Sequence, residues 1–92
     1  MTYTVHKVQF VVADGPNEIL LPIDAEFLTV NAQNDIITLW YRWDQSTTAQ
    51  DKHQFFTVGT GWPCPSRLKA NYVGSALISN GLVWHLFHRK LS

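Results

Sequence analysis

The chain has 92 residues, enough for one domain with a single hydrophobic core and too few for two. Seven basic and seven acidic side chains cancel, which excludes the basic surface of a protein that binds duplex nucleic acid or an anionic membrane. No apolar run approaches the roughly 18–20 residues of a membrane helix. The first residues do not have the pattern of a secretory signal, and the single cysteine cannot form an internal disulfide. We therefore expect one domain, residues 1–92, in the cytoplasm.

The composition also suggests a partner. Charged residues make up only 15% of the chain, whereas aromatic residues make up 13% and include four tryptophans. The core of so small a domain cannot easily enclose all of these rings. We expect that some of them meet a ligand, another protein or a second copy of the chain, and that the protein is a homo-oligomer.

Alternating and β-branched or aromatic runs between turn signals predict a mainly β protein. The predicted strands are residues 2–12, 17–21, 25–33, 36–43, 53–58, 72–79 and 82–89. A turn is expected at residues 14–17, and Pro22 suggests that the second strand lies at a sheet edge. We predict a small antiparallel sandwich or partly open barrel of about six strands, with at most one short helical turn at residues 66–70.

Asn34 and Asp35 predict a tight hairpin, because both residue types tolerate a left-handed backbone. A two-residue loop implies a definite register. The expected cross-strand pairs are Leu28–Tyr41, Val30–Leu39 and Ala32–Ile37 on an apolar face, and Thr29–Trp40 and Asn31–Thr38 on a polar one. Trp40 is therefore predicted to stand on the polar face of this hairpin.

Asn80 and Gly81 predict a second hairpin, with a type I′ turn. Its expected register places Leu77, Trp84, Ser75 and Leu86 on one face, and Ile78, Val83, Ala76, His85, Gly74 and Phe87 on the other. Both faces are partly apolar, which favours a central or interfacial position. The polar segment 44–52 between the two hairpins is predicted to be a loop.

The sequence Gly-Thr-Gly-Trp-Pro-Cys-Pro at residues 59–65 allows two interpretations. Alternating glycines let backbone N–H groups converge on an anion, with Thr60 adding a hydroxyl and Arg67 and Lys69 adding charge. The motif lacks the helix and the full glycine pattern of the specific phosphate-binding loops. The alternative is a tight corner after a strand, in which glycines permit a bend and prolines stiffen the chain.

Tryptophan rings stack on flat ligands such as nucleobases, which makes Trp40, Trp62 and Trp43 candidates for ligand contact. Arg42 lies two positions from Trp40 and is expected on the same face. The alternative role for these rings is to fill a dimer interface. The predicted ligand-binding set is Gly59, Thr60, Gly61, Trp62, Trp40, Arg42, Arg67 and Lys69.

No enzymatic or metal-binding pattern stands out. His85 and His88 are three residues apart on a strand, hence on opposite faces, and cannot chelate one metal together. Cys64 would need a nearby histidine to act as a nucleophile, and no paired carboxylates or serine-nucleophile motif is present. We expect no metal, no cofactor and no catalysis.

Five segments between about Ile19 and Phe87 carry a resemblance to a known family. They are Leu21-Pro22-x-x-Ala25-Glu26-x-Leu28-x-Val30, Leu39-Trp40, Val58-Gly59-Thr60-Gly61-x-Pro63, Tyr72-Val73-Gly74-Ser75 and Val83-Trp84-His85-Leu86-Phe87. In these segments the chain resembles a family of small phage and prophage proteins classed as a domain of unknown function. The resemblance implies no reaction and no catalytic residue.

The resemblance implies a context, since small phage proteins of this kind often act against host defence. We expect a non-enzymatic protein in the host cytoplasm that sequesters a small anionic, nucleotide-like ligand, with backbone amides and cations holding phosphates and indoles holding bases. One alternative is an inhibitor that masks a host defence protein and uses the same aromatic residues as anchors. Another is a small structural or assembly protein of a phage.

Overall fold

The computed structural model describes residues 2–10, 16–64 and 71–91. In these segments the elements are strands: β1 (Tyr3–Phe10), β2 (Asn17–Pro22), β3 (Glu26–Gln33), β4 (Ile36–Asp44), β5 (Gln50–Gly59), β6 (Asn71–Leu77) and β7 (Val83–Lys90). The mainly β prediction is confirmed. A helix long and apolar enough to cross a membrane does not occur among these residues. The predicted helical turn at residues 66–70 lies outside the described residues.

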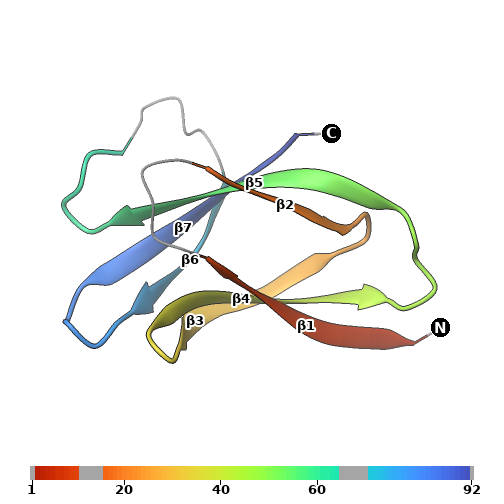
Figure 1. The fold of residues 1–92 in the computed structure, drawn as a ribbon, viewed down its shortest axis with the longest axis horizontal. Coiled ribbons are helices and arrows are strands. Elements are labelled where there is room, and N and C mark those ends of the chain that lie inside the picture. The colour runs from red at the N-terminus through yellow and green to blue at the C-terminus, as the bar shows by residue number, and fades with distance from the viewer. Residues whose placement is uncertain (1, 11–15, 65–70, 92) are drawn as a thin grey trace.

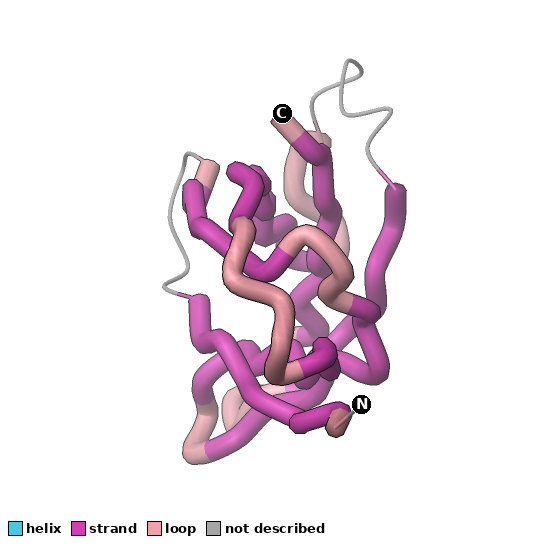
Figure 2. The backbone as a smooth tube through the Cα atoms, turned by 90° about the vertical axis from the view of Figure 1, so that its right-hand side faces the viewer, coloured by secondary structure: helices cyan, strands magenta, loops and turns pink. Residues whose placement is uncertain are grey.

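The strands form two antiparallel sheets that make a sandwich, as Figures 1 and 2 show. The three-stranded sheet has the order β1-β4-β3, and the four-stranded sheet has the order β2-β5-β7-β6. Neither sheet closes on itself, so the prediction of a sandwich or partly open fold holds. Pro22 ends the pairing of β2 with β5 at one edge of the four-stranded sheet, in agreement with its missing N–H donor.

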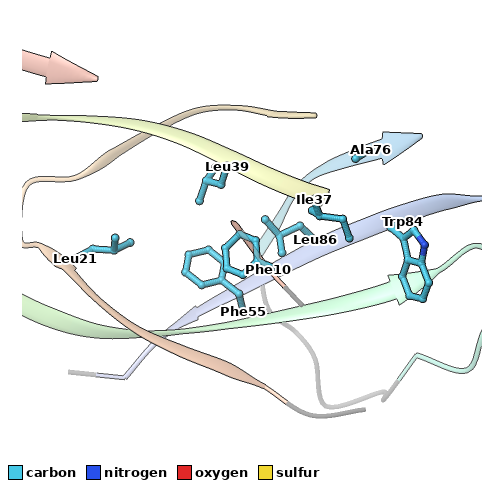
Figure 3. Packing of buried hydrophobic residues seen from close by; sticks show 8 residues of the cluster. All are labelled: Phe10, Leu21, Ile37, Leu39, Phe55, Ala76, Trp84 and Leu86. Carbon is cyan, nitrogen blue, oxygen red and sulfur yellow. The ribbon is translucent and has the colours of Figure 1, made fainter. Parts of the chain in front are cut away.

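Alternate side chains of the strands point between the sheets and form the core (Figure 3). The buried apolar residues are Phe10, Leu21, Ile37, Leu39, Phe55, Ala76, Trp84 and Leu86. Phe10 and Phe55 come from opposite sheets, and their ring centroids are 4.8 Å apart. Edge-on and tilted ring pairs of this kind add to the free energy gained by burying apolar area.

The first hairpin has the predicted turn. Asn34 and Asp35 have φ angles of 52° and 62°, as a type I′ turn requires. Four predicted pairs are confirmed: Val30–Leu39, Ala32–Ile37, Thr29–Trp40 and Asn31–Thr38. The predicted pair Leu28–Tyr41 is wrong, because a bulge at Leu28 brings Phe27 opposite Tyr41.

The second hairpin forms at the predicted place with a different register. Only Gly81 has a positive φ, 83°, and the Gly81 N–H donates to the Ile78 carbonyl at 2.9 Å. This is a three-residue loop with glycine in the left-handed position, not the predicted two-residue type I′ turn. The register therefore shifts by one residue, so that Leu77 pairs with Val83 and Ala76 with Trp84.

The shift changes which side chains share a face, because the side-chain period of a strand is two. Ala76 points into the core beside Trp84 and Leu86, whereas His85 and Ser75 point outward together. The predicted grouping of Ala76 with His85 was therefore wrong. Strand β5 also starts at Gln50, which shortens the predicted loop to residues 45–49. Residues 11 and 12 of the first predicted strand lie outside the described residues.

Candidate functional site

The predicted ligand-binding residues fall in two separate regions. Trp40 and Arg42 lie on β4 in the three-stranded sheet. Gly59 ends β5 in the four-stranded sheet, and Thr60, Gly61 and Trp62 follow it. Arg67 and Lys69 lie outside the described residues. The described part of the predicted set therefore does not form one continuous site.

The glycine pair forms a tight turn. The Trp62 N–H donates to the Gly59 carbonyl at 3.0 Å, and Gly61 has a φ of 85°. A positive φ at this position is typical of a type II turn and explains the glycine. The Thr60 N–H donates to the Val83 carbonyl at 3.0 Å. Since the Thr60 and Trp62 amides already donate within the chain, the described geometry agrees with the corner interpretation.

Trp62 folds back over this corner. A Cβ atom at Gly59 would stand 3.2 Å from the Trp62 ring, so the absence of a side chain there lets the indole pack on the backbone. The Trp62 and Trp84 rings meet edge to face with centroids 4.9 Å apart. Trp62 is nevertheless 51% exposed, while Trp84 is buried. One face of the Trp62 indole thus remains open to solvent.

A hydrogen-bonded chain of Thr60, His85 and Tyr72 lies next to the corner. Thr60 Oγ1 is 2.7 Å from His85 Nε2, and Tyr72 Oη is 2.8 Å from His85 Nδ1. Thr60 Oγ1 also donates to the Val83 carbonyl at 3.1 Å. Because the Thr60 hydroxyl has one hydrogen, it accepts from His85 Nε2–H, and His85 Nδ1 then accepts from the Tyr72 hydroxyl. These residues come from three of the five segments that carry the family resemblance. Their presence in these segments was the one feature of the sequence that pointed to this cluster.

The outer face of the four-stranded sheet, defined as the face turned away from the core, is rich in apolar side chains. Tyr72 packs edge to face on Phe87 with centroids 5.3 Å apart. The large apolar residues most exposed on this face are Leu20, Tyr72 and Leu77. Such a surface matches the apolar centre of many protein interfaces.

Trp40 stands on the outer face of the three-stranded sheet, as predicted. Its cross-strand neighbours are Lys7 on β1 and Thr29 on β3. An open hollow of about 530 Å³ is lined by Trp40, Lys7, Val5 and His6. Its volume falls within the about 300–1,000 Å³ of small-molecule pockets, but the hollow is wide open to solvent and would cover one side of a ligand. The sequence missed Lys7, Val5 and His6, because it did not show that β1 pairs with β4.

Two cations flank Trp40 on this face. Lys7 Nζ donates to the neutral amide oxygen of Gln33, which leaves the ammonium charge uncompensated by that partner. Arg42 Nη2 lies 3.3 Å from Glu26 Oε2, and the guanidinium carbon lies 5.0 Å from the centre of the Tyr3 ring. The hollow thus has a flat aromatic side and an ammonium group next to it, and Arg42 lies at the next outward-facing position along β4, outside the residues that line the hollow.

The expectation that the core does not enclose all four indoles is confirmed. Trp84 is 5% exposed, Trp62 is exposed, and Trp40 and Trp43 are half-buried. Trp43 packs against His6 with ring centroids 4.6 Å apart. Of these rings, Trp40 and Trp62 present an open face beside polar groups.

A histidine pair, with His53 buried and His88 partly exposed, lies at the β5–β7 contact, away from both regions. His53 Nδ1 lies 2.6 Å from His88 Nε2, and His53 Nε2 donates to Asp51 Oδ1 at 2.5 Å. Burial would raise the pKa of Asp51, but hydrogen bonds and charges from Lys90 and His53 outweigh burial and lower it. Burial, together with the charge of His53, lowers the pKa of His88 to about 4.

This pair escaped the sequence reasoning because His53 and His88 are 35 residues apart and meet only through strand pairing. His88 faces Phe27 across the sandwich, with ring centroids 4.9 Å apart, whereas His85 points outward. The prediction that His85 and His88 lie on opposite faces is confirmed. Cys64 is exposed. No group of three metal-ligating side chains comes together among the residues that the structure describes.

Comparison with known proteins finds no match among curated proteins or solved structures. A family model described as Domain of unknown function (DUF7352) matches residues 1–92. The expected membership in a domain family of unknown function is thereby confirmed, and the phage origin stays a prediction. Because the model covers the entire sequence, the chain belongs to the DUF7352 family.

Proposed function

We propose that this domain binds a small, planar, anionic ligand of nucleotide type in the hollow beside Trp40, without altering it chemically. The observation that carries the proposal is the placement of Lys7 directly across from Trp40 at the edge of an open hollow. A base would stack on the indole, which gains about 1–3 kcal/mol per base in comparable sites. A phosphate would take the ammonium group of Lys7.

The hollow suits this role better than the glycine corner, for an electrostatic reason. At the corner, the Thr60 and Trp62 amides donate to carbonyl groups of the chain. At the hollow, Lys7 donates to the neutral amide of Gln33, and no carboxylate pairs with it among residues 2–10, 16–64 and 71–91.

Thermal denaturation against a panel of nucleotides tests the proposal. The panel contains nucleoside mono-, di- and triphosphates, cyclic mononucleotides and cyclic dinucleotides. A ligand at one hundred times its dissociation constant should stabilise the fold by about 2.7 kcal/mol. Chromatography of the heated sample should recover the ligand unaltered; a changed ligand would indicate an enzyme instead.

Variants locate the site. Trp40→Leu retains an apolar side chain but removes the stacking surface, and Lys7→Gln removes the charge; both should weaken binding at least fivefold. Trp62→Ala is the matched control, because Trp62 is the other exposed indole and lies on the four-stranded sheet. Loss of binding in Trp62→Ala with full binding in Trp40→Leu would move the site to the glycine corner. If no member of the panel binds, nucleotide capture is refuted.

Capture of a signalling nucleotide would give the protein a role against host defence, as the phage-type resemblance implies. Whether the protein acts against host defence depends on which ligand it binds, so the nucleotide panel tests both. Cyclic nucleotides and dinucleotides are the members of the panel that bear on it. Binding of ordinary nucleotides alone would speak against a defence role.

A second candidate function is the masking of another protein, either a host protein or a second copy of the chain. The observation that favours it is the apolar outer face of the four-stranded sheet, on which Leu77 is 62% exposed and Tyr72 is 54% exposed. Leu77→Lys should then abolish association without loss of stability. Light scattering measures the oligomeric state; a monomer in both forms removes the second copy as the partner.

A further inference from the structure

Arg42 lies within reach of a ligand seated on Trp40. It is two residues from Trp40 on β4, and its cross-strand partner on β1 is Val5, another residue of the hollow. Alternate residues of a strand share a face and are separated by about 6–7 Å. Lys7 and Arg42 therefore flank the indole from two directions, one across the strands and one along them.

The contact that now occupies Arg42 is weak. Its Nη2 atom lies 3.3 Å from Glu26 Oε2, longer than the roughly 2.7–2.9 Å of a strong charge-assisted hydrogen bond. The two side chains are 43% and 60% exposed. Exposed ion pairs contribute little to stability, so a phosphate can replace Glu26 at small cost.

The guanidinium is nevertheless held in place. It lies over the Tyr3 ring, 5.0 Å from the ring centre, which limits its freedom by a cation–π contact. Arg42 Nε is buried and finds no acceptor among the described residues. A phosphate would therefore bond the Nη2 group that Glu26 now occupies, and not the buried Nε.

We propose that the ligand of this hollow carries two phosphoryl groups, one held by Lys7 and the other by Arg42, and that Glu26 occupies Arg42 until the ligand binds. This inference rests on the proposed function and narrows its ligand class to nucleotides with two phosphoryl groups, namely nucleoside diphosphates and cyclic dinucleotides. Among the described residues named here, Lys7 and Arg42 carry two positive charges against the one negative charge of Glu26, and displacement of Glu26 makes the Arg42 charge available to the ligand.

Isothermal titration of one ligand series tests the inference. The probes are adenosine and guanosine, their 5′-monophosphates and their 5′-diphosphates, at low and at physiological salt. In the unaltered chain the diphosphate should bind about tenfold or more tighter than the monophosphate, the gain expected from a hydrogen bond to a charged group. Arg42→Gln should remove that gain and leave the monophosphate affinity within about twofold.

Glu26→Gln separates the ion pair of Arg42 with Glu26 from the contact of Arg42 with the ligand. The variant should bind the diphosphate severalfold more tightly, because the phosphate no longer has to displace the Glu26 carboxylate from Arg42. Arg89→Gln is the matched control, since Arg89 bonds Gln54 on the other sheet. It should leave the whole series unchanged.

The failures are distinguishable. Equal affinity for mono- and diphosphates, or an unchanged gain in Arg42→Gln, overturns the inference while nucleotide binding at Trp40 stands. Tighter diphosphate binding that Glu26→Gln does not improve overturns the role of Glu26. If no member of this series and no member of the nucleotide panel binds, the proposed function fails, and the two-phosphate inference fails with it.

Discussion

Gly74 of β6 lies directly against Val30 of β3, in the opposite sheet. A Cβ atom on Gly74 would stand 3.0 Å from Val30 Cβ and 3.1 Å from Val30 Cγ2. The two sheets approach each other so closely here that only a hydrogen atom fits. Gly74 therefore serves the packing of the sandwich and not the flexibility of a strand.

Gly74→Ala should destabilise the protein by about 1–3 kcal/mol, because a branched Val30 side chain cannot move aside easily. Urea unfolding measures the loss. The double variant with Val30→Gly should lose less than the sum of the two single variants, since glycine removes both the Cβ and the Cγ2 atoms that the added methyl group meets. Simple additivity would mean that the two residues do not press on each other.

Acid should destabilise the protein through His88. Its pKa is about 4 in the folded chain and near 6.5 in the unfolded one, so the unfolded state binds more protons between these values. The contribution is complete above about pH 6.5 and is lost as the pH falls toward 4. We expect a loss of about 2 kcal/mol from this group, allowing for its partial exposure.

His88→Leu should flatten this part of the pH profile, as measured by urea unfolding at pH 7 and pH 4.5. His85→Leu serves as the control, because it removes an imidazole from the outer face of the same strand. An unchanged difference between the two pH values in His88→Leu would contradict the assignment to His88.

The turns of the two hairpins are tied together by Asp35 and Ser79. The Ser79 N–H donates to Asp35 Oδ1 at 3.0 Å, and the Ser79 hydroxyl donates to Asp35 Oδ2. Asp35→Gly keeps the left-handed backbone and should cost about 1 kcal/mol for the lost hydrogen bonds. Asp35→Ala should cost about 1 kcal/mol more, because alanine disfavours a φ of 62°. Thermal unfolding of both variants separates the two effects.

Gly59→Ala should move Trp62 with little loss of stability. The added methyl group would approach the indole to 3.2 Å, and the exposed ring is free to shift. The edge-to-face contact with Trp84 would then weaken. Near-ultraviolet circular dichroism should change in the tryptophan bands; an identical spectrum would show that the indole does not rest on Gly59.

Local signals sufficed for the strands of this fold and for most of one register. Asn34 and Asp35 specify a two-residue turn by their tolerance of positive φ, and most of the pairs of β3 with β4 follow by counting outward. The position of Trp40 on the outer face follows from the same count. Strand existence and the mainly β class are likewise encoded in short alternating runs.

Counting outward from the turn gave the wrong register for β6 and β7, because the φ angle of one turn residue decides the length of the loop. Asn80 does not adopt the positive φ of a type I′ turn, and one additional loop residue moved every side chain of β6 relative to β7. The bulge at Leu28 did the same on a smaller scale. Such choices depend on packing: Ala76 faces the core in the observed register, whereas in the predicted one it would share a face with His85.

The sequence by itself determined a charge-poor β domain with more indole surface than its core encloses, because composition and alternation are properties of the chain alone. Only the tertiary structure decided which side chains meet. The pairing of β1 with β4 brought Lys7 to Trp40, and the pairing of β5 with β7 brought His53 to His88. These contacts join residues more than thirty positions apart, and their partners are chosen by the packing of the two sheets, which no local pattern records.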